Sequence, residues 1–279
     1  MTSIVPICIL AASLFYVNKP VVDMRESPSH ESKVVSQTIF SENIAVEKEF
    51  EGWAYIITPD QYSGWVPKNS FVPLDEPYQT SLTVSRLAAH VYAVKDTEFG
   101  PFKTLPYGSK LCALNATDTR WVEVLLPDGK VCYIQKGDVA PEQEIHGKED
   151  LIAFCKKFIG LPYTWGGRSS FGYDCSGFVQ MLYSQIGVNL ERDAKQQVLD
   201  NRFQTVSVDC VKPGDLIYFG KSEQKITHVG MYLGDGQFIH SVVRECQPWI
   251  RISSLLDFEW SVHNEAVCPY RVFRQLIVE

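Results

Sequence analysis

One cysteine in the second half of the chain has the surroundings of a nucleophile. Cys175 lies in the run GYDCSGF (residues 172–178), among small residues and directly before an apolar run that predicts a helix over residues 178–186. A helix N-terminus lowers the pKa of a nearby thiol, so this position favours the nucleophilic thiolate. Because a single cysteine is more often a buried structural residue, the catalytic interpretation depends on finding a base.

Two histidines further along the chain are candidates for that base. His228 and His240 lie in alternating runs, residues 228–233 and 237–243, which predict two strands joined by a hairpin at GDG (234–236). Paired strands would bring the two imidazoles together. A thiol nucleophile needs a base, and the base needs a partner on its other ring nitrogen. We therefore expect the cysteine to attack, His228 to act as the general base and His240 to orient the His228 ring.

The motifs around these residues resemble those of a known family. They are LPYTWGG (161–167), DCSGF (174–178), PGDL (213–216), HVG (228–230) and FIH (238–240). Together they resemble the NlpC-type papain-like cysteine peptidases of bacterial cell-wall metabolism, over roughly residues 148–275. The resemblance implies an α+β domain in which a helix carries the nucleophile and an antiparallel sheet carries the histidines. It implies no cofactor.

The same resemblance suggests roles for four neighbouring residues. Tyr163 falls where the family places a tyrosine near the oxyanion, which it would hold together with the Cys175 backbone N–H. Asp193 falls in a segment similar to the one that receives the free amine of an N-terminal alanine, and Asp174 and Ser176 would also bind substrate. The alternative role for each aspartate is a helix cap. The alternative for Tyr163 is a core aromatic residue.

The sequence before residue 145 repeats itself. The run WAYIITPD (53–60) is matched 68 positions later by WVEVLLPD (121–128), and Trp65 is matched by Tyr133. Short β-branched and aromatic runs between turn residues predict small all-β units, and two copies are too few for a solenoid. Each copy resembles a bacterial SH3-like barrel, the second being more divergent. The barrels either bind ligands or act as rigid spacers that position the catalytic domain.

These observations divide the chain into three predicted domains. They are a first barrel over residues 1–75, a second barrel over 76–143 and an NlpC-type peptidase domain over 144–279. The connections between them are short and contain proline, so we expect the barrels to pack against the peptidase domain. The first barrel would then close one end of the cleft and admit only short peptides.

The first barrel is also expected to contact the substrate. Glu26 and Tyr62, in predicted loops, would join Asp193 around the alanine amine. The Glu26 carboxylate would pair with the ammonium, and the Tyr62 ring would exclude larger groups attached to the amine. The alternative is that both are exposed loop residues.

The peptidase domain is expected to begin with helices and to end in strands. Periodicity predicts helices over residues 149–159, 178–186 and 192–199, and strands over 215–219, 229–233, 238–243 and 270–276.

Composition excludes several classes of partner. The 279 residues carry a net charge of −7, which argues against binding to nucleic acid or to anionic membranes. The eight cysteines form no CxxC pair and no Cys/His cluster at zinc-ligand spacing, so we expect no metal. A catalytic thiol among many free cysteines suits a reducing compartment, so we expect a cytoplasmic protein. We also expect a monomer.

The first fifteen residues are apolar and allow two interpretations. They lack a basic n-region and a small-x-small cleavage site, which favours a buried first strand. A signal peptide, and hence a periplasmic or secreted protein, is the alternative. No apolar run is long enough for a transmembrane helix.

The resemblance implies a γ-D-glutamyl-diamino acid endopeptidase that acts on peptidoglycan stem peptides. Two barrels and the Asp193 segment look like the members that process small released muropeptides with a free N-terminal L-alanine. One alternative is an N-acetylmuramoyl-L-alanine amidase, or an acyl transferase, on the same scaffold. Another is a wall-binding protein without catalytic activity.

Overall fold

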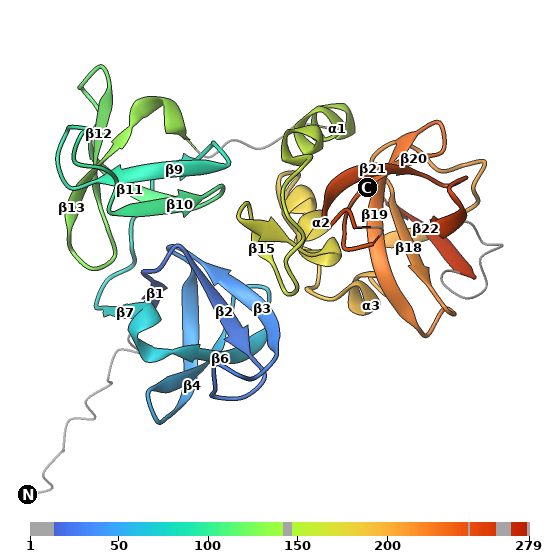
Figure 1. Cartoon of the computed structure of the whole chain (residues 1–279), viewed down its shortest axis with the longest axis horizontal. Helices are drawn as coiled ribbons and strands as arrows, with labels where there is room; N and C mark the ends of the chain where they lie inside the picture. Colours follow the sequence, from blue (N-terminus) through green and yellow to red (C-terminus); the bar gives the residue numbers. More distant parts are fainter. Residues whose placement is uncertain (1–13, 142–146, 245, 261–268, 278–279) are drawn as a thin grey trace, which may run out of the picture.

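The structure, a computed structural model, describes residues 14–141, 147–244, 246–260 and 269–277. The chain folds into two all-β units followed by a unit of helices and one large sheet (Figure 1). The predicted fold class, two small barrels ahead of an α+β domain, is therefore confirmed. Among the described residues, no helix is long and apolar enough to cross a membrane.

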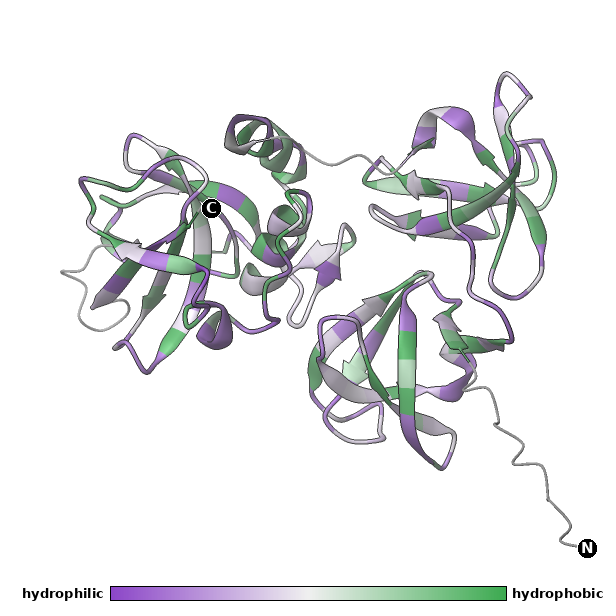
Figure 2. Cartoon of the chain, turned by 180° about the vertical axis from the view of Figure 1, so that it is seen from behind, coloured by the Kyte–Doolittle hydropathy of each residue, from purple (hydrophilic) through white to green (hydrophobic). Residues whose placement is uncertain are grey.

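The first barrel is a seven-stranded antiparallel sheet in the order β3-β2-β6-β5-β4-β1-β7. Its strands are β1 (Leu14–Val17), β2 (Val21–Arg25), β3 (Val34–Ile39), β4 (Asn43–Phe50), β5 (Trp53–Ile57), β6 (Ser63–Pro67) and β7 (Phe71–Leu74). Alternate side chains of β5 and β6, such as Ala54, Ile56 and Val66, form the core. Figure 2 shows this alternation of hydrophobic (green) and hydrophilic (purple) residues along the barrel strands.

The second barrel repeats this topology strand by strand, in the order β10-β9-β13-β12-β11-β8-β14. Its strands are β8 (Leu82–Val84), β9 (Ala88–Tyr92), β10 (Lys103–Pro106), β11 (Lys110–Asn115), β12 (Trp121–Leu125), β13 (Val131–Gln135) and β14 (Val139–Ala140). Trp53 opens β5 and Trp121 opens β12, while Trp65 and Tyr133 lie in β6 and β13. The internal repeat of the sequence is therefore a structural repeat.

The third unit carries the helices and a six-stranded antiparallel sheet in the order β17-β22-β18-β19-β20-β21. Its helices are α1 (Lys148–Cys155), α2 (Cys175–Ser184) and α3 (Ala194–Gln197). Its strands are the short pair β15 (Arg168–Ser169) and β16 (Gly172–Tyr173), followed by β17 (Phe203–Val206), β18 (Leu216–Gly220), β19 (Ile226–Gly234), β20 (Gln237–Val242), β21 (Trp249–Ser254) and β22 (Tyr270–Leu276).

The large sheet has two apolar faces. Helix α2 covers one of them, where Phe178 and Leu182 pack in the same cluster as Val229 of β19. Burying a side chain of this size contributes about 1.5–3 kcal/mol. The other face is closed by a cluster that includes Phe219 and Trp260. The sheet is thus packed between two hydrophobic cores, which hold the register of the strands that carry the histidines.

Most predicted elements of this unit occur with shifted ends. The helix predicted from residue 178 begins three residues earlier, at Cys175, and the helix predicted over residues 192–199 is only four residues long. The sequence does not predict strands β15, β16, β17 and β21. The fifteen-residue apolar stretch at the start of the chain overlaps β1 only at Leu14 and Phe15, which pair with β7, and the rest of it lies outside the described residues.

Both barrels pack against the third unit. Strand β3 of the first barrel lies against β15 and the loop before it, where the Trp165 indole N–H donates to the Val34 carbonyl. In the second barrel, the Tyr107 hydroxyl donates to the Gln185 side chain at the end of α2, and its ring contacts Phe158. In Figure 1, β15 accordingly lies between the barrels and α2.

Candidate active site

Cys175 is the first residue of α2, and an aspartate places it there. The Asp174 side chain accepts a hydrogen bond of 2.7 Å from the Gly177 backbone N–H, which caps the helix. The backbone N–H groups of Val229 and Ser176 face the Cys175 sulfur. The thiol therefore lies at the junction of α2 with strand β19, which also carries His228.

The two histidines meet across a pair of antiparallel strands. His228 Nε2 lies 2.7 Å from His240 Nδ1. In the β19–β20 register, Met231 pairs with Ile239, so His228 and His240 are diagonal neighbours on one face. Gly230, between them on β19, leaves the space for this contact, because a Cβ atom there would lie 3.2 Å from the Cβ of His240.

A serine on the next strand extends this pair. Ser253 of β21 is buried, and its hydroxyl lies 2.9 Å from His240 Nε2. If His240 Nε2–H donates to Ser253, then Nδ1 of His240 accepts from His228 Nε2–H. The His228 Nδ1 atom makes no hydrogen bond within the described part of the chain, and in this tautomer it carries a free lone pair. It is the nitrogen available to the thiol.

The protonation states differ from the sequence-based expectation. Burial, together with the Asp174 carboxylate, raises the pKa of the Cys175 thiol to about 12, although Arg192 and the backbone N–H groups act in the opposite direction. Burial, and then Arg244 and Arg251, lowers the pKa of His228 to about 3. Both shifts favour a neutral thiol and a neutral imidazole in the resting site over the thiolate that the helix position predicts. Desolvation outweighs the field of the helix N-terminus.

Tyr163 lies close to the nucleophile. Its backbone N–H donates to the Pro248 carbonyl, and it forms a bridge with Tyr173. Burial raises the pKa of its phenol, with smaller effects from the charges of Cys175 and Asp174. The phenol is thus a neutral hydrogen-bond donor beside the thiol, as a group that holds an oxyanion must be.

Asp174 and Ser176 are already engaged by the protein. Both oxygens of Asp174 accept from Arg192, and the Ser176 hydroxyl donates to Asp174 while accepting from Arg192. The capping role of Asp174 is therefore observed. A direct contact of either side chain with substrate stays a prediction, and it would have to share atoms with this network.

Asp193 and Tyr62 come together from different domains. Asp193 precedes α3 but makes no capping hydrogen bond, and its partly exposed carboxylate lies 3.3 Å from the exposed Lys195 ammonium. After burial, the Asp193 charge is the largest cause that raises the pKa of Tyr62, which extends from the first barrel. Glu26 is different, since it is exposed after β2, and within the described part of the chain its side chain makes no hydrogen bond or ion pair with this group. The structure does not bring Glu26 to this group.

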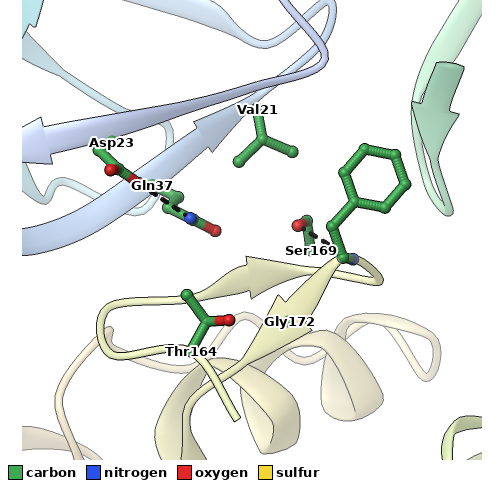
Figure 3. A pocket seen from close by; sticks show the side chains of 7 residues that line it. Val21, Asp23, Gln37, Thr164, Ser169 and Gly172 are labelled. Carbon is green, nitrogen blue, oxygen red and sulfur yellow. Dashed lines mark hydrogen bonds between the residues drawn. The ribbon is translucent and has the colours of Figure 1, made fainter. Parts of the chain in front are cut away.

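A pocket of about 300 Å³ lies elsewhere along the same domain interface (Figure 3). It is lined by Val21, Asp23, Gln37, Thr164, Ser169, Phe171 and Gly172, and by none of the predicted site residues. Gln37 follows Ser36 in β3, and successive strand residues point to opposite sides. Because Ser36 contacts Arg192, this pocket and the catalytic group lie on opposite sides of β3.

Two buried residues of this site were missed by sequence reasoning. Ser253 could have been found from the alternation of Ile250 and Ile252, which indicates a strand, but its pairing with β20 is a tertiary fact. Arg192 stands directly before Asp193, and nothing local shows that it is buried. In the described ranges no group of three or more His, Cys, Asp or Glu is arranged to hold a metal ion.

Comparison with known proteins agrees with this geometry. Residues 160–263 match the NlpC/P60 family, and residues 24–71 match the bacterial dipeptidyl-peptidase Sh3 domain. A gamma-D-glutamyl-L-lysine dipeptidyl-peptidase of Bacillus subtilis (strain 168) is 31% identical over 242 residues, which cover 81% of this chain and 78% of the relative. Dipeptidyl-peptidase 6 of Lysinibacillus sphaericus is 26% identical, over 77% of this chain and 82% of the relative.

A solved structure has the same overall fold. An NlpC/P60 family protein from Bacillus cereus ATCC 10987 superposes with a TM-score of 0.78 at 23% identity, covering 89% of this chain and 96% of that chain. The family match, over residues 160–263, includes the nucleophile helix and both histidine strands. The chain therefore belongs to the NlpC/P60 family of cysteine peptidases, with a bacterial SH3 domain ahead of the peptidase domain.

Proposed function

We propose that this peptidase cleaves the bond between γ-D-glutamate and the diamino acid of peptidoglycan stem peptides, and that it prefers short peptides with a free N-terminal L-alanine. The relatives that align along most of the chain are named for hydrolysis at a γ-D-glutamyl-L-lysine bond. One structural observation supports the preference for a free amine. The Asp193 carboxylate and the Tyr62 ring, from two domains, lie within electrostatic reach of each other next to the nucleophile helix.

That arrangement suits an ammonium group at the end of a short peptide. A carboxylate forms a charge-assisted hydrogen bond with an ammonium and has no such partner in an acylated amine. Tyr62 comes from the first barrel, so the barrel limits the room beyond that amine. A longer chain, such as a glycan strand attached to the alanine, would collide with it.

The chemistry starts from a neutral pair. When the amide carbonyl of D-glutamate is positioned at Cys175, the sulfur attacks the carbonyl carbon and His228 Nδ1 takes the thiol proton. The imidazolium that forms is held in place by His240, whose ring is held in turn by Ser253. The tetrahedral oxyanion is held by the Cys175 backbone N–H and the Tyr163 hydroxyl.

The second half of the reaction reverses the proton movement. The His228 imidazolium donates its proton to the leaving amine of the diamino acid, which leaves a thioester between Cys175 and the dipeptide. His228 then takes a proton from water, the hydroxide attacks the thioester carbonyl, and the thiol is released with its proton. No cofactor enters either half of the reaction.

The experiment compares L-Ala-γ-D-Glu-diaminopimelate and its L-lysine analogue with their N-acetylated forms. We expect products that mass spectrometry identifies as L-Ala-D-Glu and the free diamino acid. We expect kcat/KM to fall by about 10³-fold or more on acetylation, because the acetylated amine offers the Asp193 carboxylate no positive charge and takes up more room beside Tyr62. Asp193→Asn should reduce this discrimination to about 10-fold.

Each other outcome has a clear meaning. Release of L-alanine from a muramyl substrate would show an amidase, and binding to insoluble wall without turnover would show a wall-binding protein. Equal cleavage of free and acetylated peptides would contradict the role given to Asp193. We also propose that the protein works as a cytoplasmic monomer, and light scattering and cell fractionation test those two points.

A further inference from the structure

Arg192 is a fully buried cation whose hydrogen-bond partners come from two domains. Its side chain is 1% exposed. Within the peptidase domain, Nη2 donates to Asp174 Oδ2 at 2.5 Å, and Nη1 donates to Asp174 Oδ1 at 3.1 Å and to Ser176 Oγ at 3.0 Å. The third nitrogen, Nε, donates to Ser36 Oγ of the first barrel at 3.0 Å.

This geometry makes the guanidinium a rigid connector. A guanidinium is planar and presents its donors in a fixed fork, so the hydrogen bond at Nε and the two at Asp174 share one plane. A buried charge is costly unless every donor finds a partner. The Ser36 hydroxyl therefore helps to fix the angle at which Arg192 holds the Asp174 carboxylate.

The carboxylate leads directly to the nucleophile. Asp174 Oδ1, which accepts from Arg192, also accepts from the Gly177 N–H and so caps α2. Cys175 is the first residue of that helix and follows Asp174 in the chain. A rotation of the carboxylate would therefore move the helix start, the thiol and the Cys175 backbone N–H together.

The first barrel is fastened on both sides of Ser36. The Trp165 indole N–H donates to the Val34 carbonyl at 3.0 Å, and Arg168 donates from its backbone to the Gln37 side chain at 3.1 Å and from its guanidinium to the Gln37 carbonyl at 2.8 Å. Strand β3 is thus held against the peptidase domain one and two residues away from the serine. These hydrogen bonds on both sides of Ser36 fix the position of its hydroxyl relative to Arg192.

We propose that the first barrel helps to position the Cys175 thiol. Ser36 and Arg192 are then positioning residues that act through Asp174. The barrel then has a second task besides limiting the length of the substrate. A peptidase domain without a docked first barrel keeps Cys175, His228 and His240 but holds the thiol in a poorer orientation. This inference rests on the proposed role of Cys175, and its main readout does not require cleavage of the proposed peptide.

The test is Ser36→Ala in the full-length protein. The substitution leaves the Arg192 Nε–H without its partner. We expect the rate of Cys175 alkylation by iodoacetamide at pH 8, measured on the Cys175 peptide by mass spectrometry, to fall about 5-fold, in proportion to one hydrogen bond. With the proposed peptide as substrate, kcat should fall by a similar factor while KM changes less than two-fold.

A matched control separates positioning from simple loosening of the interface. Ser170 is also buried at a domain interface, where its hydroxyl accepts from the Tyr107 N–H at 2.8 Å and donates to the Leu87 carbonyl of the second barrel. Ser170→Ala should lower the thermal midpoint about as much as Ser36→Ala does, but leave the alkylation rate within two-fold. Equal alkylation in wild type and in folded Ser36→Ala would overturn the proposal.

A double-mutant cycle provides the second measurement. Arg192→Lys keeps the charge but cannot bond to Ser36 and to both Asp174 oxygens in one plane. If Ser36 acts only through Arg192, Ser36→Ala should have no further effect on alkylation in the Arg192→Lys background. Independent, multiplicative effects would show that Ser36 does not act through the arginine. Loss of peptide cleavage with a normal alkylation pattern would instead count against the proposed substrate.

Discussion

His228 Nε2 and His240 Nδ1 lie 2.7 Å apart on adjacent strands, and Ser253 Oγ lies 2.9 Å from the far nitrogen of His240. The three side chains run obliquely across β19, β20 and β21. In each contact the two residues are diagonal neighbours on adjacent strands. The strand register therefore places the orienting ring of His240 between the base His228 and the Ser253 hydroxyl. This alignment determines which imidazole nitrogen is left for Cys175.

Cys175→Ala should abolish turnover and leave the fold intact. The thiol supplies the bond to the acyl group, so kcat should fall by about 10⁴-fold or more, while removal of one sulfur atom from a half-buried site costs little stability. His228→Ala should be nearly as severe. Stopped assays with purified protein and a thermal melt measure both effects. Residual hydrolysis above about 1% in Cys175→Ala would remove this residue from the mechanism.

Ser253→Ala should lower kcat about 3- to 10-fold without raising KM. The hydroxyl holds His240 and touches no substrate, so its loss costs roughly one hydrogen bond in the transition state. His240→Asn should keep part of the activity, because an amide oxygen can still accept from His228. In a His240→Ala background, Ser253→Ala should have no additional effect on kcat. The control is Ser241→Ala, which removes a buried hydroxyl next to His240 that donates to the Tyr173 carbonyl. It should leave kcat unchanged.

Alkylation of Cys175 in the absence of substrate should increase steadily with pH. Burial raises the pKa of this thiol to about 12, so between pH 7 and pH 9 each pH unit should increase the thiolate fraction, and the rate, about tenfold. Iodoacetamide labelling of the Cys175 peptide at several pH values measures this dependence. A plateau that begins below pH 7 would instead reveal a preformed thiolate–imidazolium pair.

The buried imidazoles should make stability depend on pH. Burial lowers the pKa of His228 to about 3 and that of His240 well below its usual value. Between about pH 3 and pH 6.5, the unfolded state therefore binds more protons at these imidazoles than the folded state does. Stability is therefore complete above pH 6.5 and is lost as pH falls, by about 1.4 kcal/mol per pH unit for each imidazole.

Urea unfolding at pH 7.5, 6.0 and 5.0 measures this loss. His240→Asn removes one of the two imidazoles, so its loss of unfolding free energy between pH 6.5 and 5 should be about half that of the wild type. Parallel curves for the two proteins would mean that His240 is protonated in the folded state.

Local sequence patterns determined much of this protein. The apolar run after Cys175 and the GDG turn between the His228 and His240 strands identify the helix, although not its first residue, and the hairpin, because helical periodicity and positive backbone φ angles are local requirements. The repeat at Trp53 and Trp121 similarly identifies two copies of one barrel. These features depend on residues close together in the chain.

The tertiary structure decided the chemistry of the site. The sequence predicts a thiolate from the nearby helix N-terminus, but the packing of β19 against α2 desolvates the half-buried Cys175 thiol and raises its pKa to about 12. Arg192, Ser36 and Ser253 act through partners on other strands or in another domain, and Glu26 stays in solvent although its loop belongs to the docked barrel. Burial and pairing of this kind depend on how distant segments close around one another, and no local pattern of residues records that.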